Sequence, residues 1–315
     1  MRFVSSRWLK IGISLGLLSI LVYSVDVVRF AQHLRGARLD YIAFAFIGYV
    51  FGQIVSAYKW RLLARPLGLA QPLRTFVVYY FAGMYLNLFA PSIVAGDVGR
   101  GFLLARGNAG LGTALQSVLA DRVSGLVMLV WVSALGFLVF GPTVLPVELY
   151  YGTITAAGGT LLSWWGLPRL FSWMSSPQNV VWRSVERLIV PYQTHPKLVA
   201  WACGVAFLFH LFQLGLQGLV AHSIGLAVPF WYLMLFIPLV QIMSALPISF
   251  GGLGLREGGY VAFLALWGTR QDEAFAFGLL WSVLVLGANL IGGIVLLASS
   301  EVRSSMRDLK KTLGG

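Results

Sequence analysis

Long apolar runs, separated by short groups of charged residues or by Pro and Gly, follow one another along almost the whole chain. A helix of about 20 apolar residues spans the hydrocarbon core of a membrane, so runs of this length predict transmembrane helices. They do not alternate between apolar and polar residues, as the ~10-residue strands of a membrane barrel would. The pattern therefore predicts an all-α polytopic membrane protein with about six full transmembrane helices. These lie at about 8–28, 41–58, 117–140, 147–166, 198–221 and 274–299.

Two shorter apolar segments end in breaks that contain Pro and Gly. Residues 75–90 lead into the first break, around 91–100, and residues 231–246 lead into the second, around 247–257. We interpret each break as the tip of a re-entrant or broken helical hairpin, which enters and leaves the membrane on one side. At an offset of 156 residues the breaks match in Pro91 and Pro247, in Gly96 and Gly252, and in Arg100 and Arg256.

The basic residues orient these elements in the membrane. With the N-terminus inside, fifteen Lys and Arg residues face the cytoplasm and four face the outside, which is the bias that cytoplasmic loops of membrane proteins show. Lys59, Trp60 and Arg61 follow the second span and suit a membrane interface on the inside. Residues 180–190 combine helical periodicity with basic residues, so we expect them to form a helix on the membrane surface.

An odd number of spans precedes the second half, so the two halves have opposite orientations. We predict a first inverted repeat at 1–140 and a second at 147–300, each built around one hairpin, followed by a basic cytoplasmic tail at 301–315. Inverted repeats with helices broken near the midplane are typical of transporters, which bind their substrates at the breaks. The organisation therefore favours a transporter.

The composition excludes a soluble globular protein. Charged residues make up only 11% of the chain and the mean hydropathy is +0.80, whereas soluble domains are about 25% charged. The net charge of +12 would suit nucleic acid, but the positive-inside bias accounts for it, so we expect no nucleic-acid partner. The single Cys203 cannot form an internal disulfide, and no metal-ligand or Ser-His-Asp set is evident. We therefore expect no metal, no cofactor and no catalytic residues.

Charged residues at the breaks carry the candidate chemistry. A charge at the centre of a membrane costs ~2.5–3.5 kcal/mol on insertion scales, so it needs a partner or a function. A phosphate is the natural ligand for an Arg beside the N-terminus of a half-helix. The alternative is that these acids and bases pair with one another and hold the hairpins, and an Arg can do both. The candidate substrate-binding residues are Arg100, Arg256, Asp97, Glu257, Asp121, Arg122, Ser92, Ser249, Gly96 and Gly252.

Three motifs, taken together, resemble the transmembrane region of the lysylphosphatidylglycerol synthase/flippase family and its stand-alone flippase-like relatives. They lie in order at 91–100, with Gly96-Asp97-Val98 before Arg100, at 114–126, and at 247–258. The resemblance covers nearly the whole chain. It departs at Ala95, where a second Gly is usual before the acid, and this is a small-for-small change.

The resemblance implies a bacterial or archaeal inner-membrane protein that moves a lipid between leaflets. Relatives are linked to aminoacylated phosphatidylglycerol, to hopanoids and to isoprenoid-linked sugars. The full-length synthase needs a soluble aminoacyl-transferase domain after its membrane region, and this chain stops at Gly315, so we expect no synthase activity. From the charge bias we expect both termini in the cytoplasm.

Three functions remain open at this stage. The first is a flippase or transporter for a phospholipid or isoprenoid-linked lipid, in which Arg100 and Arg256 bind phosphate. Asp97, Asp121 and Glu257 would position these bases or contact a cationic headgroup, and Arg122 would pair with an acid. The second is a non-transporting accessory subunit of lipid or envelope biosynthesis, and the third is an integral-membrane transferase that uses a polyprenyl-phosphate donor. The partners that fit are a lipid with a phosphate headgroup, a second copy of the chain, or envelope-biosynthesis enzymes.

Overall fold

All regular elements in the described part of the computed structural model are helices. The structure describes residues 26–88, 94–105, 110–141, 144–174, 180–246, 249 and 252–299, and isolated positions between 12 and 23. The all-α prediction is confirmed for these residues. Most of the first predicted span, at 8–28, and the tail at 301–315 lie outside them.

Four helices are long and apolar enough to cross a membrane. They are α3 (Leu39–Ala64), α6 (Leu111–Phe140), α9 (Pro196–Ser223) and α12 (Gln271–Ala298). At 1.5 Å per residue, helices of this length extend about 40 Å, which exceeds the ~30 Å hydrocarbon core. Each corresponds to one predicted span, and the chain is a multi-pass membrane protein.

Helix α7 (Val147–Met174) covers the span predicted at 147–166 and has 28 residues. It is not among the four helices that combine the required length with the required hydropathy. The first predicted span lies mostly outside the described residues. Since neither α7 nor this first span is confirmed as a membrane span, the count of six spans stays a prediction.

Four helices are too short to cross a membrane alone. They are α4 (Leu73–Asn87), α5 (Val94–Ala105), α10 (Phe230–Ala245) and α11 (Leu255–Leu266). With 12 to 16 residues, they extend about 18–24 Å, less than the ~30 Å core. α4 packs on α5, and α10 packs on α11. These lengths and pairings fit the predicted hairpins, whereas their entry from opposite sides of a membrane stays a prediction.

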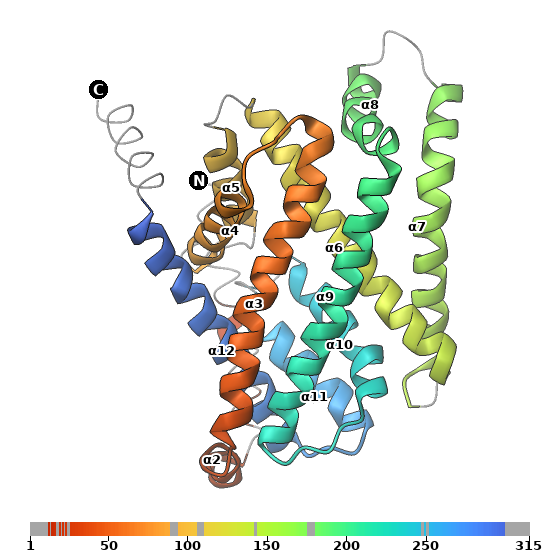
Figure 1. Cartoon of the computed structure of the whole chain (residues 1–315). Helices are drawn as coiled ribbons and strands as arrows, with labels where there is room; N and C mark the ends of the chain where they lie inside the picture. Colours follow the sequence, from red (N-terminus) through yellow and green to blue (C-terminus); the bar gives the residue numbers. More distant parts are fainter. Residues whose placement is uncertain are drawn as a thin grey trace.

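The long helices α3 and α9 pack along each other in the bundle. In Figure 1 the pair α4–α5 lies in the upper half of the molecule and the pair α10–α11 in the lower half. Helix α12 packs on α4, and α6 packs on α10. Each short pair is thus held by a long helix from the other half of the chain.

Glycine residues allow α4 and α5 to cross closely. The N–H of Gly96 donates a hydrogen bond to Asn87 Oδ1 at 2.8 Å, and a Cβ on Gly96 would collide with the carbonyl oxygen of Gly83. Helix α12 approaches α4 in the same way, because a Cβ on Gly292 would collide with the carbonyl oxygen of Phe81. Helices in membranes associate through such close packing of small residues, so the position of α4 depends on glycine at both contacts.

A shorter helix lies at each end of the bundle, α8 (Val180–Gln193) at the upper end and α2 (Val27–Arg35) at the lower end in Figure 1. Helix α8 contains the predicted surface segment at 180–190. Gln116 of α6 ties it to the bundle, since Gln116 Nε2 donates to the carbonyl oxygens of Arg187 and Leu188 at 3.0 and 3.2 Å.

Helix α2 was not predicted, because it lies largely between the spans predicted at 8–28 and 41–58, where no element is expected. Asp26 caps it: the Asp26 side chain accepts hydrogen bonds from the backbone N–H groups of Val28 and Arg29. An Asp that precedes an amphipathic run is an N-cap signal. This signal was present in the sequence and identifies the helix.

Candidate functional site

Lys59 and Trp60 correct the sequence interpretation. Both are buried in the helix bundle rather than at a membrane interface, and α3 continues beyond them to Ala64. Lys59 Nζ lies 3.0 Å from Asp121 Oδ1 on α6 and donates a hydrogen bond to the carbonyl oxygen of Asp121 at 2.9 Å. Trp60 Nε1 donates to Ser117 Oγ, also on α6, at 3.1 Å. This pairing makes the burial of Lys59 possible and adds it to the candidate residues.

Asp121 lies between two cations. Its Oδ1 faces Lys59, and its Oδ2 accepts a hydrogen bond from Arg100 Nη2 of α5 at 2.8 Å. All three side chains are buried. Buried charges are tolerated when they are paired and hydrogen-bonded, so one carboxylate joins α3, α5 and α6.

Asp97 binds two arginines. Its Oδ1 accepts from Arg100 Nε at 3.1 Å, one turn further along α5. Arg122 of α6 binds Asp97 in bidentate fashion, with Nε 2.6 Å from Oδ2 and Nη2 2.9 Å from Oδ1, a geometry that fixes both partners. Lys59, Asp97, Arg100, Asp121 and Arg122 therefore form one unit, which we call the five-charge cluster.

The two arginines of the five-charge cluster differ in access. The side chain of Arg100 is 3% exposed, and its guanidinium carbon lies 4.6 Å from the ring centre of Trp60 and 4.9 Å from that of Tyr80. Aromatic faces attract a cation at such distances. The side chain of Arg122 is 44% exposed. Its Nε and Nη2 bind Asp97, and its Nη1 has no hydrogen bond to a described residue.

The second break places Arg256 and Glu257 in the first turn of α11. Glu257 is buried and accepts hydrogen bonds from the N–H of Gly254 at 2.7 Å and from Ser282 Oγ of α12 at 2.5 Å. Arg256 forms no ion pair with any carboxylate among the described residues, and its Nη1 lies 3.5 Å from Ser282 Oγ. Direct pairing of Arg256 with Glu257, one of the open alternatives, is therefore not found, because Ser282 lies between them.

The turn before α11 depends on glycine. Gly252 and Gly254 both have φ of +82°, in the left-handed region that other residues rarely adopt. Ser249, which precedes this turn, is buried, and its Oγ has no hydrogen-bond partner among the described residues. Gly252 thus has a structural role in shaping the second break.

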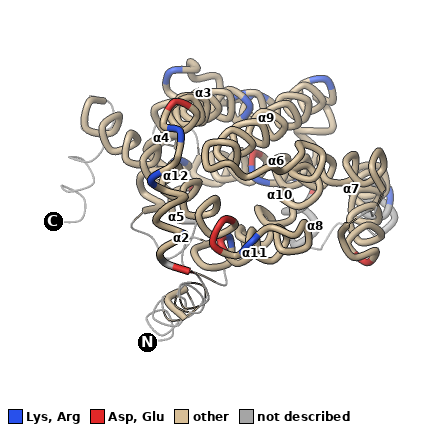
Figure 2. Tube along the Cα trace, turned by 90° about the horizontal axis from the view of Figure 1, so that it is seen from below, with Lys and Arg blue, Asp and Glu red and all other residues tan. Residues whose placement is uncertain are grey.

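Tyr49 of α3 packs between the first hairpin and α12. Its ring lies 5.5 Å from that of Trp281 on α12, and its side chain packs against Phe81 and Met84 of α4. Figure 2, a view from below, shows charged positions on α6 within the ring of helices. The interior of the bundle therefore contains charged side chains of α6.

The family model for the lysylphosphatidylglycerol synthase transmembrane region matches residues 7–293. The chain belongs to this family. No curated protein and no solved structure matches it. The matched range contains both breaks and the whole five-charge cluster, so the family predicted from three motifs is confirmed.

In this member of the lysylphosphatidylglycerol synthase membrane family, the predicted site residues fall into two groups. Helices α5 and α6 bring the four charged residues of the first half together with Lys59, while Arg256 and Glu257 lie on α11. Gly96 lies within α5, which begins at Val94, so the second part of the break predicted around 91–100 is helical. Ser92 lies outside the described residues. The roles of Lys59, Tyr80 and Ser282 were not predicted, because their partners are 20 or more residues away along the chain.

A polar face of α9 packs beside the cluster in this family member. The helical spacing of His210, Gln213 and Gln217 predicts hydrogen bonds between helices. His210 Nε2 lies 3.0 Å from the carbonyl oxygen of Gly125 on α6, and Gln217 Oε1 accepts from the Tyr260 hydroxyl group on α11 at 2.8 Å. The prediction is confirmed for these two residues.

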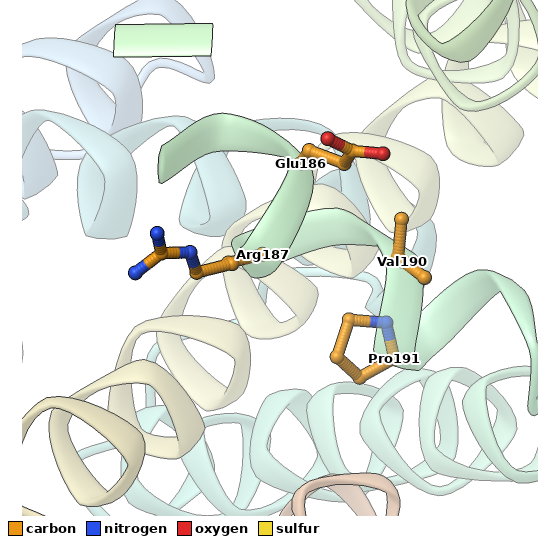
Figure 3. Close-up of a pocket in the computed structure, with 4 residues that line it drawn as sticks. All are labelled: Glu186, Arg187, Val190 and Pro191. Atoms are coloured by element: carbon orange, nitrogen blue, oxygen red, sulfur yellow. The ribbon is translucent and has the colours of Figure 1, made fainter. Parts of the chain in front are cut away.

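The hollow shown in Figure 3 lies elsewhere, on α8. It is wide open and is lined by Glu186, Arg187, Val190 and Pro191. Glu186 and Arg187 point in different directions and do not converge on its centre. The five-charge cluster is therefore a better candidate for a binding site than this hollow.

Proposed function

We propose that the protein is a transporter that moves a phosphate-bearing lipid, either a phospholipid or an isoprenoid-linked lipid, between membrane leaflets. Its place would be the cytoplasmic membrane of a bacterium or archaeon, with both termini in the cytoplasm. Arg122 carries the proposal: it is the twelfth of the 30 residues of the membrane-spanning α6, and its side chain is 44% exposed. A charge near the middle of such a helix is costly and marks a substrate path in many membrane proteins.

We assign the phosphate contact to Arg122 and Arg256. Both retain guanidinium nitrogens that no described carboxylate occupies, and guanidinium groups form strong charge-assisted hydrogen bonds with phosphate. Arg100 Nη1 also has no hydrogen-bond partner among the described residues, but Arg100 is buried, and two carboxylates and two aromatic rings enclose its guanidinium. Its role in the proposal is that of a positioning residue, which holds Asp97 in place for Arg122.

The two hairpins give the proposed transport its two sides. The α4–α5 hairpin supplies Asp97 and Arg100, and the α10–α11 hairpin supplies Arg256. A headgroup that passes from Arg122 to Arg256 would cross between regions held by opposite hairpins while its acyl chains stay in the bilayer. Helix α12 packs on α4 and α6 packs on α10, so each hairpin is in contact with a long helix of the other half.

Transbilayer movement of a fluorescent phospholipid in proteoliposomes tests this proposal. Arg122→Gln and Arg256→Gln keep a polar side chain but remove the charge. A hydrogen bond to a charged group contributes about 1.5–3 kcal/mol, so we expect movement to slow by about tenfold or more in each variant.

The matched control is Arg38→Gln. Arg38 is exposed at the start of α3 and pairs with Asp40, also exposed, so this variant should move lipid at the rate of the unaltered protein. Unchanged movement in both Arg122→Gln and Arg256→Gln would contradict the assigned site.

A second candidate function is a non-transporting subunit of lipid or envelope biosynthesis. The observation that favours it is the pairing of Lys59 and Arg100 with Asp97 and Asp121, which also suits a purely structural cluster. Purified protein separates the two candidates, because an accessory subunit alone moves no lipid. We further propose that the chain transfers no aminoacyl group, and the absence of aminoacyl-lipid formation with charged tRNA and phosphatidylglycerol tests this.

A further inference from the structure

We infer that the headgroup of the transported lipid is a phosphodiester with one negative charge and no ammonium group. This inference rests on the proposed function and names the substrate class of the same site. It is based on the carboxylates, aromatic rings and cations in the interior of the bundle.

Carboxylates that could bind an ammonium group are scarce. The chain has 11 Asp and Glu residues, and only Asp97, Asp121 and Glu257 lie in the five-charge cluster or beside Arg256. Six others lie at helix starts or on α8, and two follow α12 in the tail. These eight are Asp26, Asp40, Glu148, Glu186, Asp272, Glu273, Glu301 and Asp308.

Each interior carboxylate is already engaged and enclosed. Asp97 is 13% exposed and binds two arginines, and Asp121 is 4% exposed and binds Arg100 and Lys59. Glu257 is 1% exposed and accepts from Ser282 and from a backbone N–H. An ammonium group would therefore meet the exposed guanidinium of Arg122 instead of a free carboxylate, and like charges repel.

The two aromatic rings that the structure describes against the cluster are already engaged by a cation. An ammonium group can bind over aromatic rings, but the rings of Trp60 and Tyr80 already face the guanidinium of Arg100. Trp60 is also fully buried. The interior thus has the features of an anion site.

The net charge of the site determines how many negative charges the bound headgroup should carry. The five-charge cluster holds three cations and two carboxylates, and Arg256 is balanced by Glu257, which it meets through Ser282. One positive charge remains, and Arg122 is the cation with an exposed face. A phosphodiester carries one negative charge and neutralises it, whereas a phosphomonoester carries about −1.5 to −2 at pH 7 and would leave an excess.

The predicted headgroup differs from the lipid in the family's name. A lysyl group adds ammonium charge to phosphatidylglycerol, and the described residues contain no accessible carboxylate at the site to receive it. The charges of this chain fit phosphatidylglycerol itself better than its lysyl ester.

The test compares lipids with identical acyl chains but different headgroups. Thermal unfolding of the purified full-length protein in detergent is measured while phosphatidylglycerol, phosphatidylethanolamine, lysyl-phosphatidylglycerol or phosphatidic acid is titrated. We expect phosphatidylglycerol to bind about tenfold more tightly than the other three. Arg122→Gln makes the cluster neutral and should remove the preference, while Arg38→Gln should keep it.

Asp97→Asn supplies a variant of opposite sign. It adds one positive charge to the cluster and should shift the preference toward phosphatidic acid. If this variant does not fold, the comparison among lipids in the unaltered protein still tests the inference. Tighter binding of phosphatidylethanolamine, lysyl-phosphatidylglycerol or phosphatidic acid to the unaltered protein would overturn the inference and leave lipid transport standing. A preference for phosphatidylglycerol without transbilayer movement would support the headgroup assignment and contradict the transporter.

Discussion

At the scale of residues, Asp121 connects three helices through two cations, and the sequence revealed only one of them. Asp121 and Arg100 were identified because each interrupts an apolar region or lies at a break. Lys59 was placed at an interface, because a lysine at the end of an apolar run commonly extends to the membrane surface. Its partner lies 62 residues away, and only the packing of α3 on α6 brings the two together.

Removal of Lys59 should destabilise the protein. Lys59→Met leaves Asp121 with a single cationic partner, and breaking a buried ion pair costs about 3–5 kcal/mol. We expect a clear fall in the melting temperature in detergent, measured by tryptophan fluorescence. In a double-mutant cycle, Asp121→Asn in the Lys59→Met background should cost less than in the unaltered protein.

Arg61→Met is the matched control for this prediction. Arg61 lies two residues further along α3, is partly exposed and forms no ion pair with a described residue, so its loss should have little effect. Equal destabilisation by Lys59→Met and Arg61→Met would contradict a specific role for the Lys59–Asp121 pair.

At the scale of elements, the apolar runs predicted the positions of the helices well, but not the residues that cap them. The segment predicted at 231–246 is the helix Phe230–Ala245, and the one predicted at 75–90 lies in the helix Leu73–Asn87 and the residues that follow it. Helix α5 begins earlier in the break than predicted, at Val94. The first N–H groups of a helix lack partners within it, and here the side chain of Asn87 accepts from Gly96. A cap supplied by another helix is not readable from local sequence.

Gly96→Ala should open the α4–α5 hairpin. The added Cβ would meet the carbonyl oxygen of Gly83 and the side chain of Asn87, and overpacking of this kind costs about 1–3 kcal/mol. We expect reduced thermal stability and faster proteolysis between α4 and α5. Gly112→Ala is the control, since nothing lies within 4 Å of a Cβ there. A Gly96→Ala protein as stable as Gly112→Ala would show that the close crossing is dispensable.

At the scale of the whole molecule, the bundle has a strongly basic end and an end where acids offset the bases. The end where α3 and α7 finish and α4 and α9 begin carries Arg61, Arg65, Arg74, Arg169 and Lys197. The opposite end carries four bases, and five acids at the helix starts offset them. The bases are Arg29, Arg35, Arg38 and Arg270, and the acids are Asp26, Asp40, Glu148, Asp272 and Glu273. This segregation follows the division into cytoplasmic and external residues that the sequence suggested. The sequence could supply it because charge bias needs no knowledge of helix packing.

Labelling of single cysteines from each side of the membrane tests this orientation. In a Cys203→Ser background, Arg38→Cys and Gln271→Cys should react with a membrane-impermeant maleimide from outside, because both lie at the end opposite the basic one. Ala70→Cys, which follows α3 at the basic end, should react only in inverted vesicles. Reaction of all three from one side would exclude the predicted topology.

The unequal numbers of cations and carboxylates in the five-charge cluster also have an electrical consequence. One elementary charge moved across the whole membrane changes in energy by about 2.3 kcal/mol per 100 mV, so rearrangement of an empty site that carries one excess charge responds to voltage. Once a monovalent anion neutralises that charge, the loaded site is electrically silent. The membrane potential would then act on the return of the empty carrier and leave the step that carries the lipid almost untouched.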